Sequence, residues 1–251
     1  MKRAIENYYA TEMFFATAIS QASLTLEGRK LSAHFTGVDS EHLNMVIQKE
    51  RLHNQSQAFE SVADFFAQFG VKWAWTIQGD LVDETFLKSI ESAGYVWSDE
   101  ITVMECDLRH KDFKNEKSKL KIQECSNSMR DWGAPLVKAF ESTEEICAQY
   151  IQAHSKGQKG LYHYVGFWKG EPISALTLSV HKGLARLDDV GTLPVFQRQG
   201  YASELIQWTL ENAKIMGATM CYLGASSQGL SVYQQLGFDA LFNIQIFQKK
   251  R

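Results

Sequence analysis

The sequence predicts a mixed protein of the α/β (α+β) class, and two observations lead to this prediction. Short runs of alternating or continuous apolar residues, such as 161–168 (LYHYVGFW) and 173–180 (ISALTLSV), are typical of strands. Runs with apolar residues three and four positions apart, such as 203–216 (SELIQWTLENAKIM), are typical of amphipathic helices. Because both kinds of run occur along the chain, we expect helices packed on a central sheet.

Composition and charge exclude several classes of protein. A chain of 251 residues with 45% hydrophobic and 22% charged residues can bury a sizeable core. A net charge of −3 provides no general basic field, so no nucleic-acid partner is expected. Glu6 and Glu12 interrupt the apolar N-terminal stretch, and no segment approaches about 18 uncharged apolar residues. We therefore expect neither a signal peptide nor a membrane partner, and a cytoplasmic location.

The four cysteines are dispersed along the chain. They show no C-x-x-C spacing and no paired histidines that would complete a zinc site. We expect all four to be reduced and mostly buried, and no metal to be bound. They are Cys106, Cys125, Cys147 and Cys221.

A charge-rich stretch near the middle of the chain, 109–121 (RHKDFKNEKSKLK), predicts a linker. It divides the chain into a domain at 1–110, a linker at 111–118 and a domain at 119–251. The two halves end in the same order of elements, namely a helix that stops at a glycine, a strand, a helix and a strand. The two glycines are Gly70 and Gly217, and glycine adopts the left-handed conformation at a helix end without a steric clash. We therefore predict a tandem of related domains.

The most informative segment is 194–217 (PVFQRQGYASELIQWTLENAKIMG), in which a short loop runs directly into a helix. A strand at 185–193 precedes it, and Pro194 ends that strand. The first amides of a helix have no intrahelical acceptor and the helix dipole is positive there, so the turn favours an anion such as a pyrophosphate. Gly200 lets the backbone approach a phosphate closely, and the side chains of Gln197 and Arg198 can add donors. The patterns G-x-x-x-x-G-K-[ST] and, after a strand, G-x-G-x-x-G are both absent.

Three motifs resemble those of the Gcn5-related N-acetyltransferases (GNAT). The spacing Gln197-x-x-Gly200-x-Ala202 is similar to their [QR]-x-x-G-x-[GA] loop, which cradles the pyrophosphate of acetyl-coenzyme A (acetyl-CoA). The run 187–194 (LDDVGTLP) resembles the strand that these enzymes splay open to receive pantetheine. The run 226–238 (SSQGLSVYQQLGF) resembles their N-x-x-[AG]-x-x-x-Y-x-x-x-G-F signature. The resemblance implies a GNAT fold in the second domain, with a mixed, mostly antiparallel central sheet flanked by helices.

The resemblance also implies site residues. The backbone of Val190 and Thr192 would face the thioester and pantetheine, where an amide could hold the developing oxyanion. Tyr233 matches the tyrosine that in many family members protonates the departing thiolate. The alternative is a half-buried aromatic residue on an amphipathic helix. Ser226 stands where the family often has an asparagine that contacts the cofactor, which puts that contact in doubt. The residues expected to wrap the pyrophosphate are Gln197, Arg198, Gln199, Gly200, Tyr201, Ala202 and Ser203.

The amine that attacks an acetyl group must be neutral, so a group is needed to accept its proton. Asp188 and Asp189 are the candidates, because similar enzymes often place an acidic residue on this strand. Adjacent strand positions point to opposite faces, so at most one of the two is expected to face the acceptor. The alternative is that both are solvated or salt-bridged at a strand end. His163 and His181 are weaker candidates, as lone histidines in strand-like runs.

The first domain lacks the features of the second. No glycine occurs between Gly37 and Gly70, and Ile90 stands four residues before Gly94, where the tyrosine would be. The half resembles a smaller, degenerate GNAT-like α/β module without a cofactor site. An independent cap over the acceptor site is the alternative. Its aromatic residues have helical or strand spacing and are expected in the core; they include Phe14, Phe15, Phe65, Phe66, Trp73 and Trp75.

The sequence thus predicts an N-acetyltransferase that moves the acetyl group of acetyl-CoA to a primary amine by direct attack in a ternary complex, without a metal. The acceptor, a small molecule or a peptide, is not identified, and a homodimer is left open. The alternative is a non-catalytic acyl-CoA-binding sensor or regulatory module. A third hypothesis is an interaction scaffold without a ligand.

Overall fold

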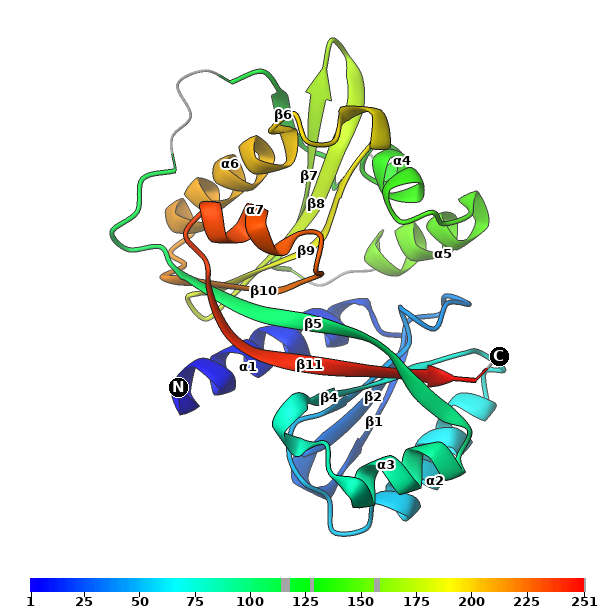
Figure 1. The fold of residues 1–251 in the computed structure, drawn as a ribbon. Coiled ribbons are helices and arrows are strands. Elements are labelled where there is room, and N and C mark those ends of the chain that lie inside the picture. Colours follow the sequence, from blue (N-terminus) through cyan, green and yellow to red (C-terminus); the bar gives the residue numbers. More distant parts are fainter. Residues whose placement is uncertain (114–117, 127–128, 156–158, 251) are drawn as a thin grey trace.

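The computed structural model describes residues 1–113, 118–126, 129–155 and 159–250 (Figure 1). The α-helices are α1 (Lys2–Ile19), α2 (Gln55–Ala67), α3 (Glu84–Ser92), α4 (Met129–Ala139), α5 (Glu144–Ser155), α6 (Tyr201–Ile215) and α7 (Leu230–Gln235). The strands of the first half are β1 (Ala22–Leu26), β2 (Leu31–Phe35), β3 (Met45–Gln48), β4 (Ala74–Gln78) and β5 (Tyr95–Asp107). Those of the second half are β6 (Lys121–Glu124), β7 (Leu161–Trp168), β8 (Glu171–His181), β9 (Leu184–Thr192), β10 (Met220–Ala225) and β11 (Asp239–Lys249). Short 3-10 turns occur at η1 (Glu27–Arg29), η2 (Gly79–Leu81) and η3 (Pro194–Phe196).

The described strands form one 11-stranded sheet in the order β1-β2-β3-β4-β11-β5-β10-β9-β8-β7-β6. Two pairs are parallel, β3 with β4 and β9 with β10, and the other pairs are antiparallel. The predicted class, a mixed and mostly antiparallel sheet flanked by helices, is confirmed.

The two halves exchange strands at the centre of the sheet. β5, from the first half, pairs with β10, and β11, from the second half, pairs with β4. β5 and β11 also pair with each other along most of their length, and Figure 1 shows them crossing the molecule side by side. The sheet is therefore continuous from one half to the other. The boundaries at 1–110, 111–118 and 119–251 stay a prediction, and 114–117 of the linker lie outside the described residues.

The last four elements of each half repeat in the order that the sequence predicted, and in the structure the repeat also includes the helix and strands before them. One helix, three strands, a helix, a strand, a helix and a strand occur in the first half as α1 to β5 and in the second as α5 to β11. Side chains fix two of the helix starts in the first half, because Asn54 accepts the amide of Gln57 and Asp83 that of Phe86. After α6, Gly217 has φ 88, the left-handed conformation expected at a helix end.

Helix α1 lies between the two halves (Figure 1). On one side it packs against β8, β9 and β10. The Tyr8 ring lies edge-on to Phe242 of β11, with centroids 5.5 Å apart. Helices α2 and α3 cover the first half of the sheet, where Phe66, Trp73 and Trp75 belong to one buried cluster. Phe65 is partly buried against this cluster, and Phe15 and Phe14 occupy comparable places in another. These six aromatic residues are therefore buried in or packed against the core, as predicted.

None of the described helices is both long and apolar enough to cross a membrane. All four cysteines are free thiols; Cys106, Cys125 and Cys221 are buried and Cys147 is half-buried, as predicted.

Candidate functional site

The loop before α6 presents free backbone amides to solvent. Arg198 and Gly200 both adopt the left-handed conformation, with φ 58 and 87, and Gly200 caps the helix. The first backbone hydrogen bond of α6 runs from the Glu204 amide to the Gly200 carbonyl. The amides of Tyr201, Ala202 and Ser203 therefore precede the intrahelical hydrogen bonds and can bind an anion.

The side chains of this turn mostly hold the turn itself. The amide of Gln197 donates to the Thr192 carbonyl at 3.1 Å, and that of Gln199 donates to the Val195 carbonyl at 3.0 Å. Both amides are thus used within the protein, and the main chain is left as the principal source of donors. The buried carboxylate of Glu204 accepts the amides of Lys119 and Leu120, both at 2.8 Å, which ties the segment before β6 to the helix.

Strands β9 and β10 separate next to this turn. Their parallel pairing covers three positions and ends with Tyr222 opposite Arg186. Beyond that point β10 pairs with β5, while β9 pairs with β8 alone. One edge of β9 therefore has no strand partner in the described chain over the stretch that contains Val190 and Thr192. This is the open strand that the sequence predicted, and its free main-chain groups can hold an extended amide-containing ligand.

A bulge in β9 changes the direction of the acidic residues. The register with β8 shifts between Ala175 and Thr177, so that Asp189 and Val190 together oppose one residue, and Asp189 has φ 55. Asp188 contacts Arg186, which in turn contacts Glu12 on α1, whereas Asp189 contacts Tyr150 on α5. Helices α1 and α5 cover the same face of the sheet, because the ring centroids of Phe15 and His154 are 5.8 Å apart. The expectation that the two carboxylates point to opposite faces is therefore wrong. That expectation assumed a regular strand, in which side chains alternate between the two faces, and the left-handed conformation of Asp189 breaks this alternation.

Asp188 belongs to a buried charged network that starts on α1. Arg186 Nε lies 2.9 and 3.0 Å from the two oxygens of Asp188, and Arg186 Nη2 lies 2.8 Å from Glu12 Oε2. The Tyr8 hydroxyl donates to Glu12 at 2.6 Å. Burial raises the pKa of Asp188 to about 7, although Arg186 opposes the shift, and the neighbouring charge of Asp189 adds to it. The first half of the chain thus contributes a carboxylate to this network.

Asp189 is held by neutral donors. Its oxygens accept the hydroxyls of Tyr150 at 2.9 Å and Thr177 at 2.7 Å, and His154 Nε2 lies 3.8 Å away. Burial raises the pKa of Asp189 to about 6, and the two hydroxyl donors oppose the shift. Both aspartates are thus partly buried carboxyl groups that change protonation near neutral pH.

Two buried histidines lead from Asp189 toward the surface. His154 Nδ1 lies 2.9 Å from His163 Nε2, and His163 Nδ1 lies 3.1 Å from the Ser126 hydroxyl, which donates to Glu124. Burial lowers the pKa of His154, and it lowers the pKa of His163 to about 4, so both rings are neutral at neutral pH. His181 lies elsewhere and stacks on Phe14 at 4.4 Å.

Tyr233 and Ser226 lie on and before α7. The Tyr233 ring is buried, lies 5.9 Å from that of Phe238, and is within electrostatic range of Asp188. Burial raises the pKa of Tyr233, and the charge of Asp188 adds to the shift, so its hydroxyl is protonated. The Ser226 hydroxyl accepts the Gly229 amide at 3.3 Å, which gives it a role at the start of the helix.

Four residues of this arrangement are missing from the sequence prediction, namely Glu12, Tyr150, His154 and Arg186. Tyr150 and His154 are four positions apart on one helix, and Arg186 and Asp188 are two positions apart on one strand, so each pair shares a face. These spacings are the available signal. They are common in ordinary helices and strands, and nothing in the sequence connects Glu12 with Arg186.

Comparisons with known structures first define the class of fold. A GCN5-related N-acetyltransferase from Kribbella flavida is similar, with a TM-score of 0.72, 13% identity, and coverage of 97% of this chain and 96% of that one. A functionally unknown conserved protein from Staphylococcus epidermidis has a TM-score of 0.71 at 15% identity, covering 95% and 98%. A tandem GNAT protein from the clavulanic acid biosynthesis pathway has a TM-score of 0.59 at 12% identity, covering 91% and 83%. These likenesses extend over both halves and show the GNAT fold.

A family model also matches part of the sequence. Residues 128–238 match the model of the acetyltransferase (GNAT) family. The matched segment contains Tyr233, the unpaired edge of β9, and the turn at 197–203, which we call the phosphate turn after its predicted ligand. A comparison with curated proteins finds no match.

Proposed function

We propose that the protein is an acetyl-CoA-dependent N-acetyltransferase that acetylates a primary amine by direct attack in a ternary complex. The match of residues 128–238 to the GNAT family model supports acyl transfer in general. The observation that carries the finer proposal is the conjunction of two features on adjoining segments. The unpaired edge of β9 at Val190 and Thr192 leads into a turn whose amides, at 201–203, are free to bind a diphosphate.

In this proposal the chain's own groups bind, orient and move protons. Free amides at the start of α6 hold the diphosphate of the cosubstrate, and the open edge of β9 holds its amide-containing arm. On the unpaired edge of β9, a backbone amide near Val190 could stabilise the carbonyl oxygen as negative charge develops on it. The amine nitrogen forms a bond to the acetyl carbon, and the carbon–sulfur bond breaks. The amine proton passes to the Asp188 and Asp189 pair, and Tyr233 returns a proton to the sulfur.

Release of free thiol tests the proposal. The purified chain is incubated with acetyl-CoA and a panel of small amines and peptides, and free coenzyme A is measured with a thiol reagent. Thiol release that depends on an amine, together with a product heavier by one acetyl group, is expected. A sensor would instead be stabilised by acyl-CoA against heat and release no thiol with any amine. If the chain shows no stabilisation by acyl-CoA and no turnover, both the enzyme and the sensor hypotheses are contradicted.

Removing the Tyr233 hydroxyl is expected to slow turnover without weakening the fold. Tyr233→Phe should lower kcat by about 10- to 100-fold, because a proton donor to the leaving sulfur is lost. The KM for acetyl-CoA should change little, since the aromatic ring stays in place. Tyr164→Phe removes another buried tyrosine hydroxyl of the same half and serves as the control. An equal effect of both substitutions, measured by steady-state kinetics, would contradict the role of Tyr233.

The aspartate pair predicts how activity depends on pH. Burial raises the pKa of Asp189 to about 6 and that of Asp188 to about 7, and only the deprotonated form accepts a proton. The value of kcat/KM should therefore fall below neutral pH and rise to a plateau above it. An arylamine acceptor, which is neutral throughout this range, keeps the amine's own titration out of the profile. The variants Asp188→Asn and Asp189→Asn show which carboxyl group causes the fall of kcat/KM at low pH. If kcat/KM of the unsubstituted protein does not change with pH, neither aspartate is the base.

A further inference from the structure

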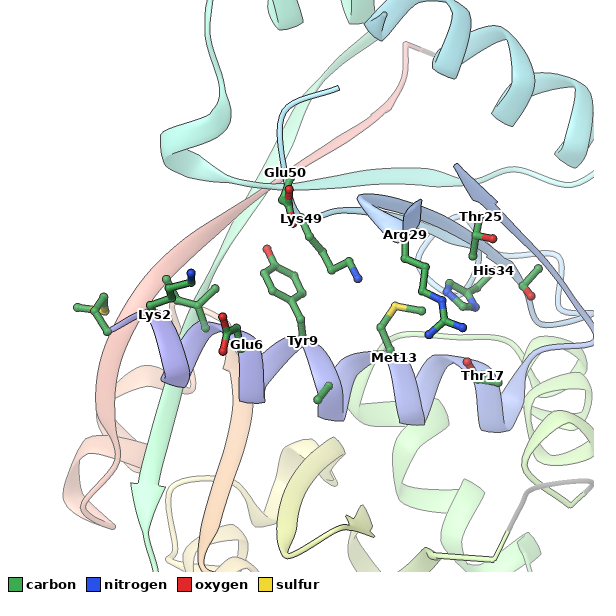
Figure 2. A pocket seen from close by; sticks show the side chains of 14 residues that line it. Lys2, Glu6, Tyr9, Met13, Thr17, Thr25, Arg29, His34, Lys49 and Glu50 are labelled. Atoms are coloured by element: carbon green, nitrogen blue, oxygen red, sulfur yellow. The ribbon is translucent and has the colours of Figure 1, made fainter. Parts of the chain in front are cut away.

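A cavity of about 1170 Å³ lies in the first half of the chain, away from the phosphate turn. One face of α1 forms its floor, and β1, β2, the η1 turn and the residues that follow β3 form its other walls (Figure 2). Its volume is enough for an organic metabolite. The degenerate half therefore contains a hollow that the acetyltransferase chemistry does not use.

Cations without an ion pair in the described part of the chain line this cavity, and Arg29 and Lys49 are the two that lie next to each other. Figure 2 shows the side chains of Arg29 and Lys49 extending into it from neighbouring segments. Among the described residues, neither has a carboxylate within ion-pair distance, whereas Lys30, next to Arg29, is paired with Glu27 at 3.6 Å. Burial lowers the pKa of Lys49; Glu50 opposes this, and the nearby charge of Arg29 lowers it further. An anion between the two cations would relieve their repulsion.

Two buried polar atoms of the cavity wall also lack a partner. The Tyr9 hydroxyl and His34 Nε2 are buried, with side chains more than nine-tenths covered, and neither has a hydrogen-bond partner in the described structure. In Figure 2, Tyr9 reaches from α1 toward Lys49, and His34 lies beside Arg29. Buried polar groups without partners are rare in folded proteins, and they point to a ligand that supplies the missing bonds.

The protonation of His34 indicates what such a ligand carries. The Ser20 hydroxyl donates to the Ala16 carbonyl at 2.5 Å, so it can only accept from His34 Nδ1, which lies 3.3 Å away. Burial lowers the pKa of His34 to about 4, so the ring is neutral and its Nε2 is an acceptor. A matching ligand therefore places a hydrogen-bond donor, such as a hydroxyl group, against His34. Burial raises the pKa of Tyr9, so Tyr9 remains a donor toward an anion.

We propose that this cavity is a binding site for a small organic anion that carries a carboxylate or phosphate group and a hydroxyl group. The anionic group lies between Arg29 and Lys49 and accepts the Tyr9 hydroxyl, and the ligand hydroxyl donates to His34 Nε2. Glu6 and Glu50 also line the cavity and are exposed, as are Lys2 and Arg29; the three cations Lys2, Arg29 and Lys49 outnumber these two carboxylates. The site is independent of the acetyl-CoA site and of catalysis.

Calorimetric titration of the full chain with three probes tests the site. L-malate and succinate differ by one hydroxyl group, and inorganic phosphate supplies the alternative anionic group. We expect L-malate or phosphate to bind, and L-malate to bind about three- to tenfold more tightly than succinate, because only L-malate can donate to His34. Binding of L-malate supports a carboxylate ligand, and preferential binding of phosphate supports a phosphate ligand. The proposal is overturned if no probe binds at up to about 10 mM, which is weaker than most specific small-molecule sites.

Substitutions test whether the probes bind in this cavity. Arg29→Gln and Lys49→Gln should each weaken binding about tenfold, since each removes a charge-assisted contact, whereas Lys30→Gln should leave it unchanged. Tyr9→Phe should weaken it without lowering Tm, because the deleted hydroxyl has no partner within the described protein. Gly200→Asp, at the phosphate turn, should have no effect. Binding that survives Arg29→Gln and Lys49→Gln but is lost in Gly200→Asp belongs to the acetyl-CoA turn and overturns the proposal.

Discussion

Gly200→Asp is expected to abolish measurable acetyl-CoA binding, whereas Gly217→Asp is expected to leave it intact. A side chain at position 200 places a carboxylate at the start of α6, where it competes with the diphosphate for the amides of residues 201–203 and repels its charge. Loss of one anion-binding cradle of this kind should weaken binding by more than about 100-fold.

Gly217 is the matched control because it lies at the other end of the same helix. Both glycines are left-handed, with φ 87 and 88, and a Cβ added at either meets nothing within 4 Å. The backbone strain of the two substitutions is therefore similar. An aspartate favours a helix N-terminus and disfavours a C-terminus, so Gly200→Asp should be the more stable variant. Isothermal titration with acetyl-CoA measures the difference, and tight binding by Gly200→Asp would refute the assignment of the turn.

Arg186→Met is expected to destabilise the whole chain by about 3 to 5 kcal/mol, because it leaves two largely buried carboxylates, Glu12 and Asp188, without their cation. The side chains of Arg186 and Glu12 are only 6% and 8% exposed, so water cannot replace the lost partner. Protonation of Asp188 relieves the penalty. The cost should therefore be larger at pH 8 than at pH 5, on the two sides of the pKa of about 7.

Arg109→Met provides the comparison. Arg109 pairs with Asp107, also two residues away, but its side chain is 58% exposed, and a pair of this kind contributes little to stability. Denaturant unfolding of both variants at the two pH values measures the effects. Equal costs for the two substitutions would show that the network between α1 and β9 does not hold the halves together.

The parts of the fold that depend on local pattern were predictable. The helix at 203–216, the strands on either side of it and the repeated order of elements follow from apolar spacing and from glycines such as Gly217 at helix ends. The strand exchange was not predictable, because the residue patterns of β5 and β11 do not specify which strand lies beside each of them. Residues 22–48, with three short strands, gave no signal strong enough for an assignment.

The candidate site divides in the same way. The turn at 197–203 was predicted from its residues, and the open edge of β9 from the family resemblance; each lies within one continuous segment. The direction of the Asp189 side chain could not be predicted. An aspartate with φ 55 in a strand depends on tertiary contacts, here with Tyr150 and Thr177. The link from Glu12 to Arg186 joins positions that are far apart in the chain, and only the folded structure brings them together.

The exchange of β5 and β11 makes the two halves structurally interlocked. A polypeptide limited to residues 119–251 would present β10 without β5, and β11 without either of its neighbours, as bare edges open to aggregation. The first half cut off on its own would lose the strand that joins β4 to β5. Such fragments are complementary to each other, and we expect neither half to fold stably without the other.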